Sequence, residues 1–389
     1  MAFIHERKAW PNLTWKEDAV SAAAAYVHHR QGVLYGKMEG YQNVHCQIKA
    51  DLDARTDDVV KSAAIEGETL DPKAVRDSLA RQIGFSVSEE EPPTPEVDGF
   101  VRVIVNATQS CYQDSLTEER LLGWHASLFQ SAVDGGERIT SGAWRTPASG
   151  AMQVVSGAVG KEVVHFEAPE AARLPREMEH FLQWLDNSSG LDPLLRAGVA
   201  HLYFVTIHPF EDGNGRIARV ISDMVLSQGV CWRRRYFSLS AQIYAERKDY
   251  YEKLEATQRG GLDITPWLKW FVECCGRAVE RAHNDLETTV VRQKVWRVVV
   301  DTPTINARQR RALTHLLNGE AEKVSTTKYA RLTECSEDTA LRDMTALVDA
   351  GFLQKDGKGG RSTRYGLPEL AILDHIAKGG LRSFKVRRG

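Results

Sequence analysis

The chain has 389 residues, a length that suits two or three domains. Its 50 Lys and Arg balance 52 Asp and Glu, so the formal charge of -2 excludes attraction of the whole molecule to nucleic acid or to an anionic membrane. Hydrophobic residues at 42% and charged residues at 26% predict a folded globular protein rather than a disordered one. The six cysteines form no CxxC pair and no long uncharged apolar run occurs, so we expect a cytoplasmic protein that does not cross a membrane.

The N-terminal part is predicted to be helical. Residues 15–41 are rich in alanine and carry apolar residues at helical spacing, and residues 43–78 continue this pattern. Gly67 is a plausible helix stop, so we expect one helix to end near Glu66. Residues 86–98 contain five acids and three prolines, which predicts a linker or an exposed loop.

The central part combines helices with one hairpin. Residues 101–130 read as two helical segments, and β-branched residues on either side of a glycine-containing loop predict a hairpin around 154–164. Residues 193–207 are apolar almost all round, which predicts a buried helix. Further helices are expected at 174–185, 216–226, 241–258 and 265–290.

The C-terminal part differs in charge and in pattern. Residues 302–389 hold 16 basic and 10 acidic residues, a net charge of +6, whereas the remainder of the chain carries -8. We place the boundary near Pro303. Helices are predicted at 308–317, 326–332 and 336–350, followed by two short strands around a glycine-rich turn, a pattern typical of a winged helix.

One segment, His208 to Arg219 (HPFEDGNGRIAR), gathers residues with catalytic chemistry. A Gly-Asn-Gly triplet at the start of a helix lets successive N–H groups converge on an anion. Arg216 and Arg219 are three residues apart on one helix face, so both guanidiniums can reach a single polyphosphate.

Two further side chains complete this segment. Asp212 offers the hard oxygen ligand that Mg²⁺ on a phosphate chain requires, and His208 has the pKa range of a general base near neutral pH. Each feature alone is more often structural or merely solvated. Together within twelve residues they favour transfer of a nucleotidyl group to a protein hydroxyl.

The same segment resembles the signature HPFx[D/E]GNGRxxR of the Fic family at every defined position. The resemblance implies transfer of AMP from ATP to a Ser, Thr or Tyr hydroxyl of a target protein, with Mg²⁺ as cofactor. An acidic residue at 212 favours AMP transfer over the phosphocholine or kinase-type chemistry of some relatives. The implied roles are general base for His208, Mg²⁺ ligand for Asp212, α-phosphate contact for Asn214, backbone anion hole for Gly213 and Gly215, and distal-phosphate contacts for Arg216 and Arg219.

Two weaker resemblances concern binding partners. The 154–164 hairpin is similar to the Fic flap that binds a segment of the target by strand addition, although a purely structural hairpin is an equal alternative. The sequence around Tyr250 and Tyr251 resembles the family's continuation, in which a tyrosine borders the adenine pocket.

An upstream segment, Ser62 to Gly67, matches the pattern [S/T]xxxE[G/N] of the Fic inhibitory helix. The resemblance implies that Glu66 pairs with Arg219 and prevents it from holding the γ-phosphate. A carboxylate at a helix end, four residues after Ser62 on the same face, can compete for a guanidinium in this way.

The predicted fold is mainly α, with a Fic-type helical core, a β-hairpin flap and a C-terminal winged helix. We expect domains at 1–98, 99–300 and 301–389. The predicted function is an ATP-dependent protein adenylyltransferase that is inhibited by its own Glu66. A DNA-binding regulator with a nucleotide-sensing Fic core and a hydrolase that removes AMP are the alternatives.

The winged helix offers basic residues for phosphate contacts. DNA, a protein partner and a second copy of the chain, as a homodimer, are its alternative partners. Ser336 is expected to cap the recognition helix that bears Arg342. The other basic residues are Lys355, Lys358, Arg361 and Arg364 in the wing, and Lys378, Arg382, Lys385, Arg387 and Arg388 in the tail.

Overall fold

The computed structural model describes residues 2–40, 44–85, 92–109, 115–130, 133–134, 137–138, 140–157, 163–229, 234–319, 321–356 and 363–378. The chain divides into two compact units, Met1–Ala282 and His283–Gly389. The first unit contains all of the predicted domain 1–98 and most of the predicted domain 99–300.

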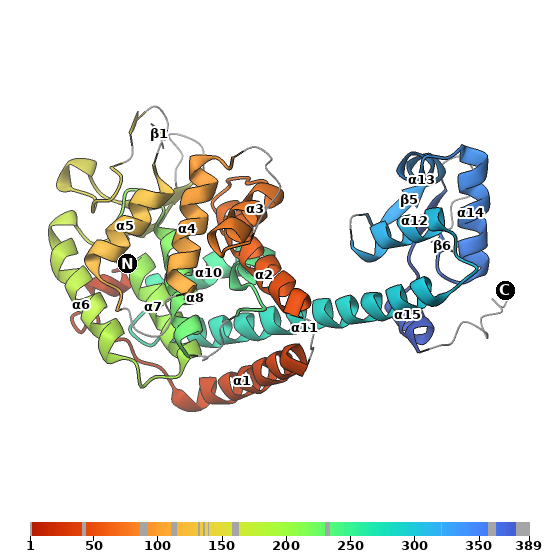
Figure 1. The fold of residues 1–389 in the computed structure, drawn as a ribbon. Helices are drawn as coiled ribbons and strands as arrows, with labels where there is room; N and C mark the ends of the chain where they lie inside the picture. The colour runs from red at the N-terminus through yellow and green to blue at the C-terminus, as the bar shows by residue number, and fades with distance from the viewer. Residues whose placement is uncertain are drawn as a thin grey trace. The chain divides into compact units, whose positions relative to one another are not determined.

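The first unit is mainly helical, as predicted (Figure 1). Its helices are α1 (Glu17–Gly40), α2 (Val44–Ile65), α3 (Pro72–Gln82), α4 (Pro95–Gln109), α5 (Glu118–Leu128), α6 (Leu174–Asn187), α7 (Pro193–Ile207), α8 (Asn214–Gly229), α9 (Leu239–Ala245), α10 (Arg247–Gln258) and α11 (Thr265–Asp301), whose last residues belong to the second unit. Short 3₁₀ turns lie at Ile4–Glu6, Pro147–Ser149 and Ala171–Arg173. The strands are β1 (Val133–Asp134), β2 (Glu137–Arg138), β3 (Gln153–Ser156) and β4 (Val163–Glu167), and they pair as two antiparallel hairpins.

Three sequence predictions about helices need correction. Residues 95–98, predicted as linker, form the first turn of α4, because a proline at the first helical position lacks only an N–H that would have no partner there. The helix predicted at 241–258 is two helices, α9 and α10, separated at Glu246. The helix predicted to end at 290 continues to Asp301.

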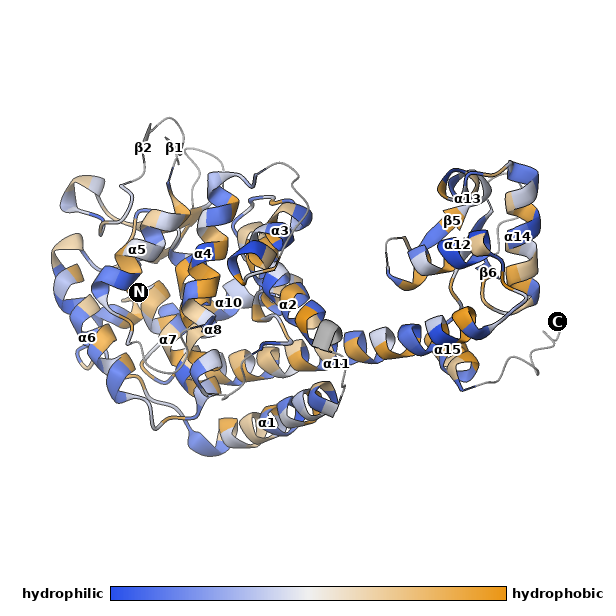
Figure 2. Cartoon of the chain, viewed as in Figure 1, coloured by the Kyte–Doolittle hydropathy of each residue, from blue (hydrophilic) through white to orange (hydrophobic). Residues whose placement is uncertain are grey.

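The core of the first unit is built around α7 and α8, which lie side by side (Figure 1). Every residue of α7 from Leu194 to Ile207 is buried except Arg196, as its uniform apolarity predicts. Asp192 caps the helix, because its carboxylate accepts the Leu194 N–H at 2.8 Å. Figure 2 shows the many hydrophobic residues of α4, most of which are buried against this core.

Helix α2 of the N-terminal domain ends beside the first turns of α8. It packs against α3, α4, α8 and α9 and ends at Ile65, next to the predicted end at Glu66. Gly67 follows with a φ of +91°, a conformation that a residue with a Cβ adopts only with strain. The chain therefore turns sharply after α2, and Glu66 and Glu68 lie against α8.

The described part of the second unit contains the end of α11, four further helices and a three-stranded sheet. The further elements are α12 (Ala307–Leu317), α13 (Thr326–Thr333), α14 (Glu337–Asp349), α15 (Leu370–Ala377), β5 (Lys323–Ser325), β6 (Gln354–Lys355) and β7 (Arg364–Gly366). The strand order is β5-β7-β6, all antiparallel. Ser336 caps α14 as predicted, whereas β5, which has three residues, and α15 were not predicted.

A buried carboxylate holds the helices of the second unit together. Asp343 of α14 accepts hydrogen bonds from Arg308 at 2.9 Å and from the Tyr329 hydroxyl at 3.2 Å. These bonds join α12, α13 and α14 around one polar centre.

Within the described residues, none of the helices combines the length and the apolarity needed to span a membrane.

Candidate active site

The loop between α7 and α8 begins with a strained histidine. His208 has φ 51° and ψ 59°, a left-handed conformation that is uncommon outside glycine. Arg145 holds this loop in place: its Nε donates to the His208 carbonyl at 2.7 Å, and its own N–H donates to the Pro209 carbonyl at 2.9 Å. Strain that is maintained by specific bonds is typical of functional sites.

The bonding of the His208 ring determines which nitrogen carries its proton. Nδ1 lies 3.1 Å from the Val205 carbonyl oxygen, which can only accept, so Nδ1 is the donor. In the neutral ring Nε2 therefore has a free lone pair. Burial lowers the pKa of His208, and this effect exceeds the opposing one of the Val205 bond, so the ring is neutral at pH 7.

The two glycines of the loop are required by space and by conformation. Gly213 has φ +81°, and a Cβ at this position would lie 2.6 Å from a ring carbon of Phe129. A Cβ at Gly215 would lie 2.2 Å from Oε1 of Glu66. A side chain at either position would therefore displace a neighbour, the Phe129 ring at Gly213 and the Glu66 carboxylate at Gly215.

Asn214 braces the same loop. Its side-chain oxygen accepts the Phe210 N–H at 2.9 Å and its Nδ2 donates to the Phe210 carbonyl, also at 2.9 Å. The residue is buried, and both ends of its side-chain amide, predicted to contact the α-phosphate, are bonded to the loop backbone instead.

Arg219, the second signature arginine, is bound by α2 on several sides. Its Nε donates to the Ser62 hydroxyl at 2.7 Å, and its Nη2 donates to the Ser62 carbonyl at 3.0 Å and to Oε1 of Glu66 at 2.6 Å. Burial raises the pKa of Glu66, but the charge and the hydrogen bond of Arg219 outweigh it, so the pKa is lowered and the carboxylate is ionised. The structure thus brings Ser62, Glu66 and Arg219 together, although Glu66 and Arg219 are 153 residues apart.

Arg216, the first signature arginine, is bound by two other carboxylates. Its Nη1 lies 2.8 and 2.9 Å from the two carboxylate oxygens of Glu68, and its Nη2 lies 3.2 Å from Oδ2 of Asp212. The guanidinium also lies 4.7 Å from the Phe129 ring centroid. Sequence reasoning missed Glu68, which lies outside both motifs; a second acid two residues after Glu66 was the available signal.

The two predicted adenine-pocket tyrosines lie in different environments. Tyr250 is 2% exposed, and its hydroxyl lies 2.9 Å from Nε2 of His201 on α7. Tyr251 is 39% exposed, and its hydroxyl donates to the Ile65 carbonyl at 3.4 Å. Tyr251 therefore lies at the open side of the site, next to the end of α2, whereas Tyr250 is a core residue.

A second histidine supports the loop and was not predicted. His125 stacks on Phe210 with ring centroids 4.0 Å apart. Its Nδ1 accepts the Gly142 N–H at 3.0 Å, so its Nε2 carries the proton toward the Asp212 carbonyl at 3.1 Å. Burial lowers its pKa to about 4, so the ring stays neutral. No local motif marks this residue.

A buried charge cluster fastens α2 to α8 behind the site. Arg235 lies 2.6 Å from Oδ1 of Asp223 on α8 and 3.6 Å from Oδ2 of Asp58 on α2. The Ser238 hydroxyl donates to Asp58 at 2.5 Å. Burial raises the pKa of Asp58 to about 7. This cluster fixes α2 against α8, and so fixes where Glu66 meets Arg219.

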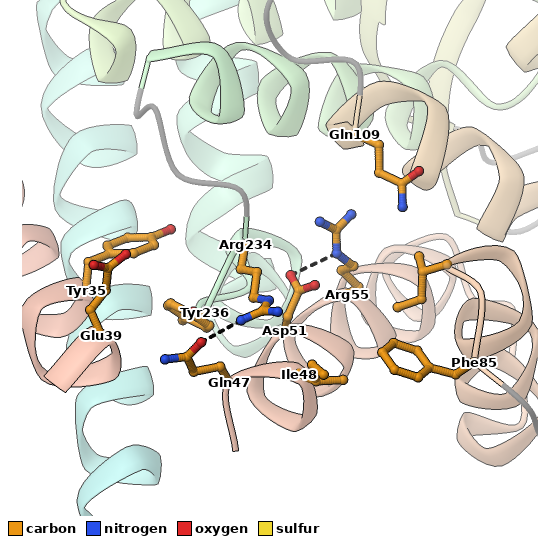
Figure 3. A pocket seen from close by; sticks show the side chains of 11 residues that line it. Tyr35, Glu39, Gln47, Ile48, Asp51, Arg55, Phe85, Gln109, Arg234 and Tyr236 are labelled. Atoms are coloured by element: carbon orange, nitrogen blue, oxygen red, sulfur yellow. Dashed lines mark hydrogen bonds and ion pairs between the residues drawn. The ribbon is translucent and has the colours of Figure 1, made fainter. Parts of the chain in front are cut away.

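A cavity of about 630 Å³ lies near the start of α2 (Figure 3). Its lining includes the charged side chains of Asp51, Arg55 and Arg234. Asp51 accepts from Nε of Arg55 at 2.9 Å and from the Arg235 N–H at 2.9 Å. Arg234 donates to the Gln47 side chain at 2.6 Å. Polar contacts therefore continue along α2 from Gln47 to Glu66.

The predicted hairpin is present as β3 and β4. All four residues of β3 are exposed, whereas Phe166 of β4 is buried. Nε of Arg259 donates to the His165 carbonyl at 3.0 Å and so attaches β4 to the end of α10. Residues 158–162, the predicted turn, lie outside the described part.

Some of the predicted basic residues of the C-terminal part are described. Arg342, Lys355 and Arg364 are exposed on α14, β6 and β7. Lys378 lies 2.5 Å from Asp374 and is exposed. The other predicted contacts, Lys358, Arg361, Arg382, Lys385, Arg387 and Arg388, lie outside the described residues.

Comparison with known proteins places these features in a family. Residues 115–226 match the Fic/DOC family, and residues 3–85 match a domain of unknown function, DUF4172. The chain is 27% identical over 241 residues to "Protein adenylyltransferase Fic" of Aedes aegypti, which covers 60% of this chain and 42% of that protein. It is 25% identical over 236 residues to "Protein adenylyltransferase fic-1" of Caenorhabditis elegans, covering 59% and 42%. The chain thus matches less than half the length of these curated relatives.

A solved structure supports the fold. The crystal structure of a Fic family protein from Desulfovibrio desulfuricans G20 matches with a TM-score of 0.54 and 23% sequence identity, over 92% of this chain and 98% of that one. At this identity the likeness concerns the fold alone. The family match and the signature loop between α7 and α8 together show that the chain contains a domain of the Fic/DOC family.

Proposed function

We propose that this protein transfers AMP from ATP to a hydroxyl side chain of a target protein, and that its own Glu66 restrains the reaction. The observation that carries the proposal is the loop between α7 and α8, where His208, a glycine-lined turn and two arginines lie within one motif. The relatives named protein adenylyltransferase support the same chemistry.

His208 is suited to the role of general base. With Nδ1 bonded to Val205, its Nε2 is free to take the proton of the incoming hydroxyl. The hydroxyl oxygen forms a bond to the α-phosphorus, the bond from that phosphorus to the bridging oxygen of the β-phosphate breaks, and pyrophosphate leaves. In this proposal the backbone N–H groups of the turn at Gly213 and Gly215 stabilise the charge that develops on the phosphate. The Gly213 N–H donates to Oδ1 of Asp212 at 2.5 Å, so a phosphate oxygen would have to replace this bond.

Asp212 fits the predicted role of Mg²⁺ ligand. Its side chain is 49% exposed; Oδ1 accepts the Gly213 N–H at 2.5 Å and Oδ2 lies 3.2 Å from Arg216. A metal ion would therefore share these oxygens or replace one of the two bonds. Among the described residues there is no group of three acidic, His or Cys side chains that could hold a metal by itself, so the phosphates would have to supply further ligands. A bound Mg²⁺ would neutralise phosphate charge there.

Glu66 restrains the reaction by occupying Arg219. Nε and Nη2 of Arg219 are bonded to Ser62 and Glu66, so two of its three guanidinium nitrogens are already occupied and the Glu66 charge opposes the approach of a γ-phosphate. ATP can then bind only with its γ-phosphate displaced, or after Glu66 has moved. The fixed position of α2, held by Arg235, makes this restraint a property of the folded unit.

The hairpin of β3 and β4, with its exposed strand β3, is the proposed docking edge for the target. Val154, Val155 and Val163 are large apolar residues with 36, 47 and 56% of their surface exposed. A strand edge with exposed apolar side chains can pair with an extended segment of another protein.

Incubation with ATP labelled at the α-phosphate tests the proposal. We expect label on protein in the presence of Mg²⁺, more with Glu66→Gly, and at least about 100-fold less with His208→Ala. Loss of label from a modified protein on addition of the wild type would favour AMP removal instead. Salt-sensitive retention of DNA without labelling would favour the regulator, a reading supported by the exposed Arg342, Lys355 and Arg364 of the second unit.

A further inference from the structure

Glu68 makes a contact with the site that no motif assigns. Its carboxylate binds Arg216 through both oxygens, at 2.8 and 2.9 Å from Nη1. The Arg216 side chain is 5% exposed, whereas that of Glu68 is 46% exposed. Glu68 thus covers the outer side of a buried guanidinium that the proposed function assigns to the distal phosphates of ATP.

Glu66 and Glu68 reach different arginines because of the residue between them. Gly67 has φ +91°, and the chain turns at this point. Glu66 extends to Arg219 on one side of the turn, while Glu68 extends to Arg216 on the other. Removal of one carboxylate leaves the other ion pair in place, so the two contacts are separate obstacles to phosphate binding.

Competition for Arg216 follows from charge. The guanidinium already lies 3.2 Å from Asp212, so a phosphate oxygen that approaches it meets two carboxylates. A phosphate can replace Glu68, which returns to water at low cost because it is half exposed. ATP binding therefore includes the free energy of breaking this ion pair.

We propose that Glu68 is a second inhibitory carboxylate, which occupies Arg216 and lowers the affinity of the site for ATP independently of Glu66. The inference rests on the proposed function only in taking ATP as the ligand. Glu68 acts by binding Arg216 and takes no part in the reaction itself.

Binding of α,β-methylene-ATP with Mg²⁺ to the full chain tests the proposal, because the bond that would break is replaced in this analogue. Isothermal titration calorimetry would compare the wild type with Glu68→Gln, which removes the charge and keeps the shape. We expect the variant to bind about threefold to tenfold more tightly, as suits the loss of a half-exposed ion pair from the unbound state. The same gain should occur when Glu68→Gln is combined with Glu66→Gly.

Two controls separate this effect from general ones. Glu119→Gln removes a charge from an exposed glutamate in the first turn of α5 and should leave the affinity unchanged. The difference between wild type and Glu68→Gln should shrink between 50 and 500 mM NaCl, about a threefold decrease in Debye length, because a half-exposed ion pair is screened. A purely structural role for Glu68 would instead lower the melting temperature and weaken binding.

Each outcome bears on the proposal. Equal affinity of wild type and Glu68→Gln, or an equal gain from Glu119→Gln, would overturn it. Absence of analogue binding in every variant, including the double variant, would overturn both this inference and the proposed function. Tighter binding by Glu68→Gln without AMP transfer by any variant would support the role of Glu68 and overturn the proposed function alone.

Discussion

The polar side chains of the two units differ in their surroundings. In the first unit Arg219, Arg145 and Arg235 are 1, 3 and 5% exposed, and each is bonded to particular carboxylates or carbonyls. In the second unit the Arg311 side chain is 59% exposed, and Arg342 lies on the surface of α14.

This difference determines what each set of charges can do. A buried guanidinium has lost its water, so the groups that replace water must stand at fixed positions. The first unit can therefore hold one reacting geometry. An exposed guanidinium keeps its water and contributes charge rather than geometry, which suits a general anionic partner. Substitutions of the buried groups of the first unit should accordingly have specific effects, and substitutions of the exposed basic residues of the second unit small ones.

The largest effect is expected at His208. His208→Ala should lower AMP transfer about 100-fold to 10,000-fold, because the base acts on the hydroxyl, and leave ATP binding nearly unchanged. Label incorporation in the Glu66→Gly background and calorimetric ATP binding would measure the two quantities. If ATP binding were lost as well, His208 would be needed for the structure of the loop and not as a general base.

Release of Arg219 should give the next largest effect. Glu66→Gly should raise AMP transfer about tenfold to hundredfold, because a charge-assisted pair of this kind contributes about 1.5–3 kcal/mol. Adding Arg219→Ala should cancel the gain, since the arginine that was freed is then absent. Labelling of all three proteins under the same conditions provides the measurement, and equal labelling of wild type and Glu66→Gly would contradict the restraint.

The buried cluster predicts an effect of pH on stability. Burial raises the pKa of Asp58 to about 7 from an ordinary value of 3.8, so between these values the folded state binds more protons than the unfolded state. The free energy of unfolding should therefore fall as pH rises from about 4 to about 7, and Asp58→Asn should reduce this fall by on the order of 1 kcal/mol or more.

Urea unfolding of the first unit at pH 4.5 and pH 7 would measure this difference. Asp249→Asn, at an exposed position in the first turn of α10, is the control and should retain the wild-type slope. An unchanged slope in Asp58→Asn would show that the proton of the buried cluster is held by Asp223 and not by Asp58.

The smallest effect on transfer is expected in the second unit. Arg342→Ala and Lys355→Ala should leave AMP transfer within about twofold of wild type, because exposed side chains contribute little to the geometry elsewhere. If DNA is a partner, each should weaken duplex binding and reduce its salt dependence, as measured by fluorescence anisotropy. A large loss of transfer in either variant would remove the distinction between the two units.

The sequence correctly predicted helices whose pattern of apolar residues is uniform along the segment. The uniform apolarity of residues 193–207 predicted a buried helix, and α7 is buried almost all round. The prediction was wrong at Pro95, which was placed within the linker 86–98 and instead begins α4. The break at Glu246 has no strong local signal, since helical spacing continues across it.

The amino-acid sequence was sufficient to predict the family and the residues of the loop from His208 to Arg219, because these groups are contiguous and their spacing on one turn and one helix face is a local property. The distant groups that contact this loop became known only from the folded structure. Arg145, His125 and Glu68 reach it from distant segments, and no periodicity relates them to it. Burial in the folded unit, which makes an ion pair specific, arises only when α2 and α8 pack together.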